Sequence, residues 1–226
     1  LKDRSVDGLI LIATAIRESP GLPTVVVSGH VPLPEVTNVI IDHDAAAEQA
    51  LTHLLELGHR RIAFLKGNVR NTDTADRWRA ISEKAEELGL EIRPELVKEI
   101  GGPVGEDLFS PERRYRTGFE IGEELLAADS RFTALFTFND VSAIGAIRAF
   151  LDAGLRVPED VSVIGFDDIP SARFQNPSLT TVHQPLREMG ELAASTLLDR
   201  LSGAPQQDFL TVESTLVVRG SSGPAP

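Results

Sequence analysis

The sequence predicts an α/β fold built from parallel βαβ units. Short runs rich in β-branched residues alternate with longer stretches of helical periodicity, an order typical of parallel units rather than of hairpins. Most of the short runs are continuously apolar, as strands covered by helices on both faces require. The length of 226 residues is enough to bury a core as one large domain or as two lobes of about 100–120 residues.

The expected strands are the β-branched runs themselves. They are Val6–Ile12, Thr24–Ser28, Asn38–Asp42, Arg61–Lys66, Leu96–Ile100, Ala134–Phe138, Ser162–Phe166, Thr180–Gln184 and Thr215–Val218. We expect Gly101–Ser110 to form a loop and the small-residue tail Gly220–Pro226 to fray.

Apolar residues at helical spacing predict the helices between these strands. The pattern is clearest in Ala46–Leu57, where alanines and leucines recur three and four positions apart and a glycine follows as a C-terminal stop. Val141–Ala153 repeats it, with Asn139 or Asp140 placed to cap the N-terminus. The other expected helices are Ala80–Leu88, Thr117–Ala128 and Leu186–Leu201.

Composition excludes several classes of function. Asp and Glu outnumber Lys and Arg by 34 to 22, and phosphate binding needs clustered basic residues, so we do not expect this segment to hold DNA or RNA by itself. The absence of cysteine excludes disulfides and thiol catalysis and suits a reducing cytoplasm. No apolar run approaches the ~20 residues of a membrane span, so we expect no membrane partner.

Catalytic and cofactor motifs are also missing from the sequence. It contains no G-x-S-x-G, no Walker A loop, no H-E-x-x-H and no G-x-G-x-x-G. The histidines lack the spacing of metal ligands; they are His30, His43, His53, His59 and His183. We therefore expect no enzyme activity, no cofactor and no metal site.

Polar side chains follow several expected strands at their carboxyl ends, where open parallel sheets bind ligands. These residues are Asp42, Asn139, Asp140, Asp167, Asp168 and Gln184. Each also has a structural explanation, because Asp42 and Asn139 could cap the helices that follow and Asp167–Asp168 could form a turn before a proline. Position alone leaves both interpretations open.

Sequence motifs resemble one protein family along essentially the whole chain. The segment VPEDVSVIGFDDIPSARFQNPSLTTVHQPLREMGELAASTLLDRL, at Val157–Leu201, closely resembles the effector domain of the lactose-repressor (LacI-type) family of bacterial transcription regulators. VDGLILI at Val6–Ile12, NVIIDHDAAAEQALTHLLELGHRRIAFLKG at Asn38–Gly67 and FTALFTFNDVSAIGAIRAFLDAGLRVP at Phe132–Pro158 follow in the family's order. Periplasmic sugar-binding proteins share the fold, but LTTVHQP after GFDD is typical of the regulators.

The resemblance implies two doubly wound parallel-sheet lobes of the periplasmic-binding-protein-like type, with a ligand cleft between them. It implies that residues 1–41 and 185–208 form an incomplete N-terminal lobe, and that residues 42–184 and 209–226 form the C-terminal lobe. Family members begin with a helix-turn-helix and two further βα units. We therefore expect the DNA-binding domain to be absent from this chain and to lie upstream of Leu1.

The resemblance also implies six ligand-binding positions: Asp42, Arg77, Phe109, Asn139, Asp167 and Gln184. Arg77 falls where the family carries an effector-binding arginine, whose fixed donors suit vicinal hydroxyls or a carboxylate. Alternatively, Arg77 could be a solvated charge at the start of a helix. Phe109 matches an aromatic pocket wall that suits the apolar face of a sugar or a base. Asp140 and Asp168 are expected to be structural, and Trp78 could line the pocket or merely pack.

The expected function is that of a cytoplasmic effector-binding and dimerisation domain. A small sugar or polyol would favour one arrangement of the lobes and so control operator binding through the upstream helix-turn-helix. A purine or a sugar phosphate is the alternative ligand. The runner-up function is a periplasmic sugar-binding protein of a transport system, which predicts an upstream signal peptide and a monomer. An enzyme is the third hypothesis, and turnover of a bound ligand would support it.

Overall fold

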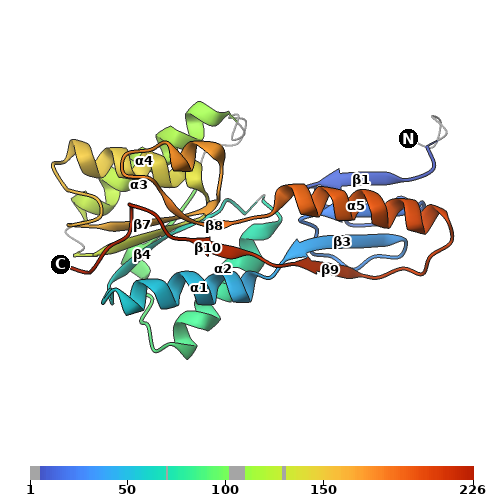
Figure 1. Ribbon diagram of the computed structural model, residues 1–226, viewed down its shortest axis with the longest axis horizontal. Helices are drawn as coiled ribbons and strands as arrows, with labels where there is room; N and C mark the ends of the chain where they lie inside the picture. Colours follow the sequence, from blue (N-terminus) through green and yellow to red (C-terminus); the bar gives the residue numbers. More distant parts are fainter. Residues whose placement is uncertain (1–5, 70, 102–109, 129–130) are drawn as a thin grey trace. The chain divides into compact units, whose positions relative to one another are not determined.

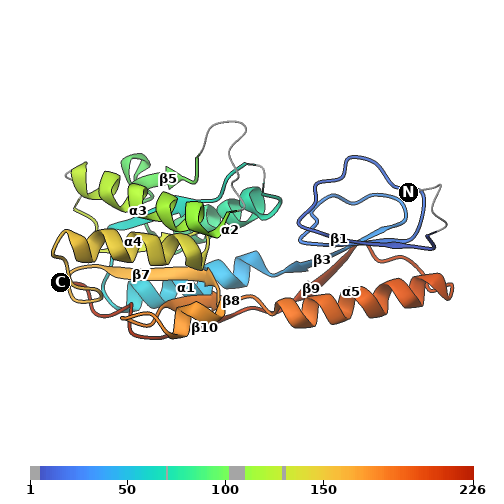
Figure 2. The ribbon, with the colours of Figure 1, turned by 90° about the horizontal axis from the view of Figure 1, so that it is seen from above.

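The computed structural model describes residues 6–69, 71–101, 110–128 and 131–226. The chain divides into two compact units (Figures 1 and 2). The smaller unit comprises Leu1–Asp42, Val69–Ala75 and Pro185–Ser214, and the larger comprises His43–Asn68, Asp76–Gln184 and Thr215–Pro226. Each unit contains a sheet dominated by parallel strands, so the predicted α/β class is confirmed.

The smaller unit is a sheet in the order β1-β2-β3-β9, with all its pairs parallel. Its strands are β1 (Leu9–Ile12), β2 (Thr24–Val27), β3 (Val36–Ile41) and β9 (Phe209–Val212). Helix α5 (Leu186–Leu201) packs along β1, β2 and β3, as Figure 1 shows. The valines of β2 are buried throughout, as the continuous apolar run predicts.

Strand β9 was not expected, and it changes the division of the chain. Phe209 pairs with Asn38 and Val212 with Ile41, so this segment completes the smaller unit's sheet. The expected division placed residues 209–226 in the larger lobe; in the structure the smaller unit continues to Ser214 and also takes Val69–Ala75. The four-residue run FLTV alternates in burial, so nothing local to it shows which distant strand it joins.

The larger unit has a sheet in the order β10-β8-β7-β6-β4-β5, and only β10 pairs antiparallel among the described strands. The strands are β4 (Ile62–Lys66), β5 (Val97–Glu99), β6 (Ala134–Thr137), β7 (Ser162–Asp167), β8 (Thr180–His183) and β10 (Thr215–Val217). Its helices are α1 (His43–Glu56), α3 (Pro111–Ala127), α4 (Asp140–Asp152) and α2 (Asp73–Glu87) from Asp76 onward. Figure 1 shows α3 and α4 on one face of this sheet and α1 on the other.

Two helices begin earlier than their apolar periodicity predicts. Helix α2 starts at Asp73 rather than near Ala80, and α3 at Pro111 rather than near Thr117. Both added turns are rich in charged residues, so hydrophobic spacing alone does not reveal them. Within the described residues, no helix combines the length and the apolar character needed to span a bilayer.

Helices α3 and α4 lie against each other through glycines. A Cβ atom on Gly118 would lie 2.2 Å from the carbonyl oxygen of Ser142, and one on Gly145 would lie 2.1 Å from that of Tyr115. Neither position has room for any side chain, because the neighbouring atoms belong to the backbone. This close packing fixes α4, whose N-terminus forms part of the site described below.

The C-terminal tail does not fray, contrary to the expectation from its composition. Ser221 is fully buried, and its hydroxyl donates to the carbonyl of Val163 (2.6 Å) and accepts from the amide of Thr180 (2.8 Å). The imidazole of His59 donates from Nε2 to the carbonyl of Gly223 (3.0 Å). The small glycine and serine residues let the tail lie against these partners, so the tail becomes part of the larger unit.

Candidate functional site

Three of the predicted ligand residues lie past neighbouring strand ends of the larger sheet. Strands β6, β7 and β8 are adjacent and parallel, so their carboxyl ends share one edge, which we call the strand-end edge. Asn139 follows β6, Asp167 ends β7 and Gln184 follows β8. The sheet order therefore brings these three residues to the same edge, where ligands of parallel α/β sheets bind.

Arg77 reaches the same edge from helix α2, and it is not the solvated charge of its structural alternative. The residue is 4% exposed, and its guanidinium carbon lies 4.4 Å from the ring centre of Phe138 and 3.5 Å from that of Phe166. Its Nη1 donates to the carbonyl of Phe138 (2.6 Å). Contacts of this kind between a cation and an aromatic ring contribute about 0.5–2 kcal/mol each. The stack holds the guanidinium plane at the edge.

The two stacking phenylalanines were missed at the sequence level, although a local signal was present. Phe138 directly precedes Asn139, and Phe166 directly precedes Asp167. Neighbouring side chains of an extended chain point to opposite faces. A phenylalanine next to a ligand candidate is therefore expected to face the core and not the site. Only the packing of α2 against the sheet shows that both rings contact Arg77.

Asn139 performs the capping role that was its structural alternative. Its Oδ1 accepts a hydrogen bond from the amide of Ser142 (2.9 Å) at the start of α4, which satisfies one of the unpaired amides of a helix N-terminus. The side chain is half-buried. A ligand contact from Asn139 stays a prediction.

Asp167 and Asp168 form a turn in an unusual backbone conformation. Their φ angles are +114° and +54°, a region that residues other than glycine adopt at a cost of about 1–3 kcal/mol each. The predicted ligand residue Asp167 is half-buried, and its carbonyl accepts a long hydrogen bond (3.5 Å) from the amide of Gln184. Such a turn persists only when its surroundings hold it.

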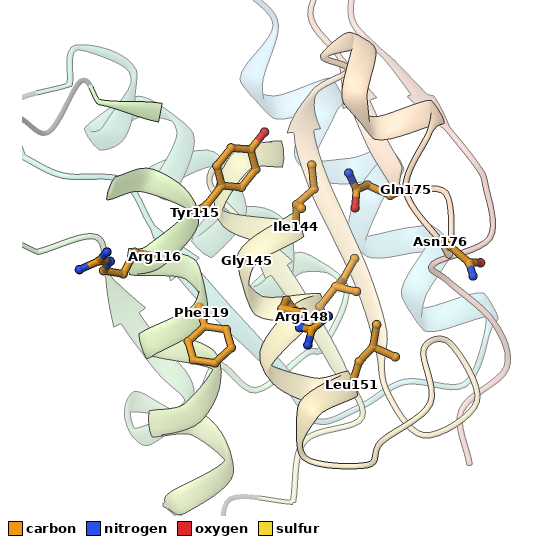
Figure 3. A pocket seen from close by; sticks show the side chains of 10 residues that line it. Tyr115, Arg116, Phe119, Ile144, Gly145, Arg148, Leu151, Gln175 and Asn176 are labelled. Atoms are coloured by element: carbon orange, nitrogen blue, oxygen red, sulfur yellow. The ribbon is translucent and has the colours of Figure 1, made fainter. Parts of the chain in front are cut away.

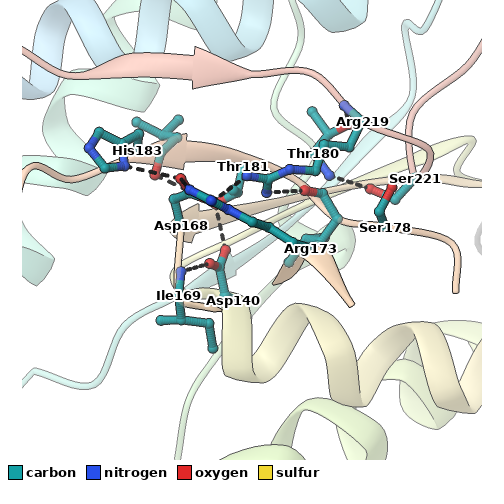
Figure 4. Close-up of polar contacts among 12 residues, drawn as sticks. Asp140, Asp168, Ile169, Arg173, Ser178, Thr180, Thr181, His183, Arg219 and Ser221 are labelled. Atoms are coloured by element: carbon teal, nitrogen blue, oxygen red, sulfur yellow. Dashed lines mark hydrogen bonds and ion pairs between the residues drawn. The ribbon is translucent and has the colours of Figure 1, made fainter. Parts of the chain in front are cut away.

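Asp168 anchors this turn through two arginines and a histidine (Figure 4). Its carboxylate accepts from Arg219 Nη2 (2.5 Å) and His183 Nδ1 (3.1 Å), and Arg173 Nη2 lies 3.6 Å away. Burial pushes the pKa of Asp168 upward, but the hydrogen bond and charge of Arg219, aided by His183 and Arg173, outweigh it and leave the pKa below its usual value. Asp168 is structural, as the sequence predicts.

Asp140 holds the turn from the other side. The residue is fully buried; its Oδ2 accepts from the amide of Ile169 (2.8 Å) and its Oδ1 from the hydroxyl of Thr181 (2.5 Å). Burial raises the pKa of Asp140 to about 6, while the bonds from Thr181 and Ile169 work against that rise. Gly165 makes room for it, because a Cβ there would lie 2.2 Å from Asp140 Oδ1.

The remaining predicted residues lie elsewhere or outside the described chain. Asp42 follows β3 in the smaller unit, and its amide donates to the carbonyl of Val212 (3.3 Å); its ligand role stays a prediction. Phe109 lies outside the described residues. Trp78 packs edge-to-face on Phe64, with ring centres 5.8 Å apart, so the structure favours the packing alternative for this residue.

A concave surface lies on the outer face of α3 and α4 (Figure 3). This α3–α4 groove encloses about 560 Å³ and is lined mainly by apolar side chains, among them Tyr115, Phe119, Ile144 and Leu151. None of the predicted ligand residues lines it. The neighbouring Phe174 is 86% exposed, which is unusual for so large an apolar side chain.

The fold and the strand-end edge together define a class: an α/β binding domain of two parallel-sheet units with polar side chains gathered past its strand ends. Residues 51–222 match the family model described as periplasmic binding protein-like domain. The chain belongs to this family, as an effector-binding domain of the LacI type.

Individual relatives agree with this assignment. The repressor PurR of Haemophilus influenzae (strain PittEE) is 38% identical over 190 residues, covering 82% of this chain and 53% of the relative. A structure of the regulator CelR with cellobiose is 32% identical with a TM-score of 0.82, and the match covers 97% of this chain and 67% of the CelR chain. A LacI-family regulator from Enterococcus faecium with bound ribose is 27% identical with a TM-score of 0.81, and the match covers 99% of this chain and 82% of the regulator's chain. This chain therefore spans about half the length of the Haemophilus relative. All three relatives are transcription regulators, which does not favour the transport alternative.

Proposed function

We propose that this chain is the effector-binding and dimerisation domain of a cytoplasmic bacterial transcriptional repressor. It binds a small sugar or polyol without turnover, and the binding controls operator recognition by a helix-turn-helix upstream in the full protein. Ligand affects DNA binding through its different affinities for the alternative arrangements of the domain. Asp42, Arg77, Phe109, Asn139, Asp167 and Gln184 are the proposed ligand residues.

The observation that carries this proposal is the stacked guanidinium of Arg77 at the strand-end edge, where Asp167 ends β7. The Phe138 and Phe166 rings fix the donor plane at the strand-end edge, and Asp167 ends the same strand that carries Phe166. A fixed guanidinium and a carboxylate from the same sheet edge offer a donor and an acceptor to hydroxyl groups, as a sugar or polyol presents. The cellobiose and ribose in the two related regulator structures favour the same ligand class.

A thermal-shift panel tests the ligand class. Cellobiose, ribose, a phosphosugar and hypoxanthine would each be added to the purified chain. A ligand at 100 times its Kd stabilises the folded state by about 2.7 kcal/mol, so a true ligand raises the melting temperature by several degrees. We expect a sugar to produce the shift. A shift with hypoxanthine alone would contradict the sugar assignment.

Asp167→Asn then tests the location of the site, because it keeps the side chain's size and removes its charge. We expect this variant to lose the ligand-induced shift. Asp160→Asn is the matched control, since Asp160 is also a half-buried aspartate but lies before the opposite end of β7, where its carboxylate accepts from the amide of Arg156 (2.8 Å). If the Asp167 variant kept the full shift, the strand-end edge would not be the site.

We also propose that the full regulator works as a homodimer and that the α3–α4 groove contributes to the contact. The groove has an apolar part formed by Tyr115, Phe119, Ile144, Ile147 and Leu151, and the adjacent Phe174 presents an exposed ring to solvent. In a two-fold dimer the same patch faces itself, so one face must offer both a protrusion and a hollow. Phe174→Asp should shift the chain toward monomer in sedimentation velocity. Leu198→Asp, which changes an exposed residue of α5 in the smaller unit, should not; equal effects would contradict the surface assignment.

A further inference from the structure

The Asp167–Asp168 turn stands in a conformation that its own residues disfavour. Both φ angles are positive and neither residue is glycine, so the local sequence does not hold Asp167 in place. The contacts that do so come from segments distant in the chain. They belong to Asp140 at the start of α4 and to Arg219 in the C-terminal tail.

Asp140 links three elements at one point. Its two oxygens accept from the amide of Ile169, immediately after the turn, and from the hydroxyl of Thr181 on β8. Because Asp140 is itself the first residue of α4, a helix that is packed tightly through Gly145 fixes its position. The partial positive charge of the helix N-terminus also favours a carboxylate there.

Arg219 closes the opposite side of the turn, as Figure 4 shows. Its Nη2 donates to Asp168 (2.5 Å), its Nη1 to the carbonyl of Leu179 (2.8 Å), and its amide to the hydroxyl of Thr180 (2.9 Å). The buried Ser221 two residues later holds this part of the tail against β8. The docked tail therefore has a role beyond filling space.

We propose that Asp140 and Arg219 are positioning residues, which hold the Asp167–Asp168 turn so that the Asp167 carboxylate can bind the ligand. This inference rests on the proposed function, since it takes Asp167 as the ligand residue. Neither positioning residue needs to touch the ligand. Asp140 acts as a hydrogen-bond acceptor, so its acceptor oxygens matter more than its volume.

The test compares three replacements of Asp140. Asp140→Asn keeps an acceptor oxygen and the volume, Asp140→Leu keeps the volume without an acceptor, and Asp140→Ala keeps neither. Hydrogen exchange at the amide of Ile169 reports the anchor without any ligand. We expect exchange to accelerate by about tenfold or more in the Leu and Ala variants, the loss expected for a bond to a charged acceptor, and to stay close to wild type in Asp140→Asn.

Arg219→Met provides a second route if the apolar variants of Asp140 do not fold. It removes the donors to Asp168 from the other side, and it should accelerate exchange in the amides around the turn. Asp160→Asn is again the control and should leave exchange there unchanged. If the amide of Ile169 exchanged as slowly in Asp140→Leu as in the wild type, the anchoring role of Asp140 would be overturned. Where Asp140→Leu does not fold, wild-type exchange in Arg219→Met would overturn it.

A double-mutant cycle then separates positioning from general destabilisation. With cellobiose or ribose, whichever shifts the wild-type melt, Asp140→Leu should weaken binding at least tenfold in the wild-type background and have no effect beside Asp167→Asn. Equal weakening in both backgrounds would overturn the proposal. If neither sugar binds, or if Asp167→Asn binds normally, the proposed ligand site fails, and the exchange experiment alone decides whether Asp140 holds the turn.

Discussion

The strand-end edge belongs to the same unit as the α3–α4 layer, by which we mean the contact of helices α3 and α4 through Gly118 and Gly145. The two regions are stabilised by different kinds of contact. At the edge, buried charges find partners: Arg77 lies against two aromatic rings, and Asp168 contacts Arg219, Arg173 and the imidazole of His183. Between α3 and α4, Gly118 and Gly145 bring the two backbones close together. The edge therefore depends on electrostatic contacts, whereas the layer depends on the close approach of two backbones.

The largest expected effect is on the layer. Gly145→Ala places a Cβ atom 2.1 Å from a backbone oxygen, so α3 and α4 must move apart, at a cost of about 3 kcal/mol or more. Urea unfolding should show this loss. Gly190→Ala is the control, since a Cβ at that position of α5 meets nothing within 4 Å and should stabilise the helix by up to about 1 kcal/mol. Equal effects of the two changes would contradict the close packing.

The second prediction concerns how the edge responds to pH. The pKa of Asp140 is raised by burial from 3.8 to about 6, so the folded state binds a proton that the unfolded state releases between these values. The contribution of this group to stability therefore increases as pH falls from 7 through about 6 toward 4, by roughly 2–3 kcal/mol in total.

Asp140→Asn removes this proton binding and gives the measurement its control. Stability measured by urea unfolding at pH 7 and at pH 5 should rise less, or fall more, on acidification in the variant than in wild type. Asp168 acts in the opposite direction, because its pKa is lowered and its contribution is lost only at more acidic pH. An identical pH dependence in both proteins would contradict the burial of a titrating Asp140.

The third prediction tests the stack that holds the guanidinium. Arg77→Lys keeps the positive charge but replaces the planar group that lies against Phe138 and Phe166, and it should cost about 1–2 kcal/mol of stability. Arg187→Lys on α5 is the control. Arg187 pairs with Glu191 at an exposed site, so the change should stay within about 0.5 kcal/mol. If Arg77→Lys left the stability unchanged, the two rings would not favour a guanidinium over an ammonium group.

The smallest expected effect is a difference in stability between two variants of Asp167, which separates backbone strain from loss of the side chain. At a φ of +114°, glycine is accommodated more easily than alanine, so Asp167→Gly should be about 1 kcal/mol more stable than Asp167→Ala. Both variants lose the same carboxylate, so their difference in melting temperature isolates the backbone. Alanine matching or exceeding glycine would mean that the turn relaxes out of its positive-φ conformation.

Several elements of the fold could be predicted because their signals are local. The apolar runs of β4, β6 and β7 and the periodicity of α1 and α4 appear in the sequence where the structure has these elements. The first turns of α2 and α3 were missed because they are rich in charged residues. Strand β9 and the docked tail were missed because short or small-residue segments take their structure from distant partners.

The site divides in the same way. The sequence by itself determined which polar residues end the strands, Asn139, Asp167 and Gln184 among them, since a strand end is a local property of the pattern. Only the tertiary structure decided which side chains control them: Arg77 lies between rings that follow β6 and end β7, and Arg219 reaches Asp168 across 51 positions of the chain. Those contacts depend on sheet order and on packing between elements, and neither is encoded in the spacing of residues along one segment.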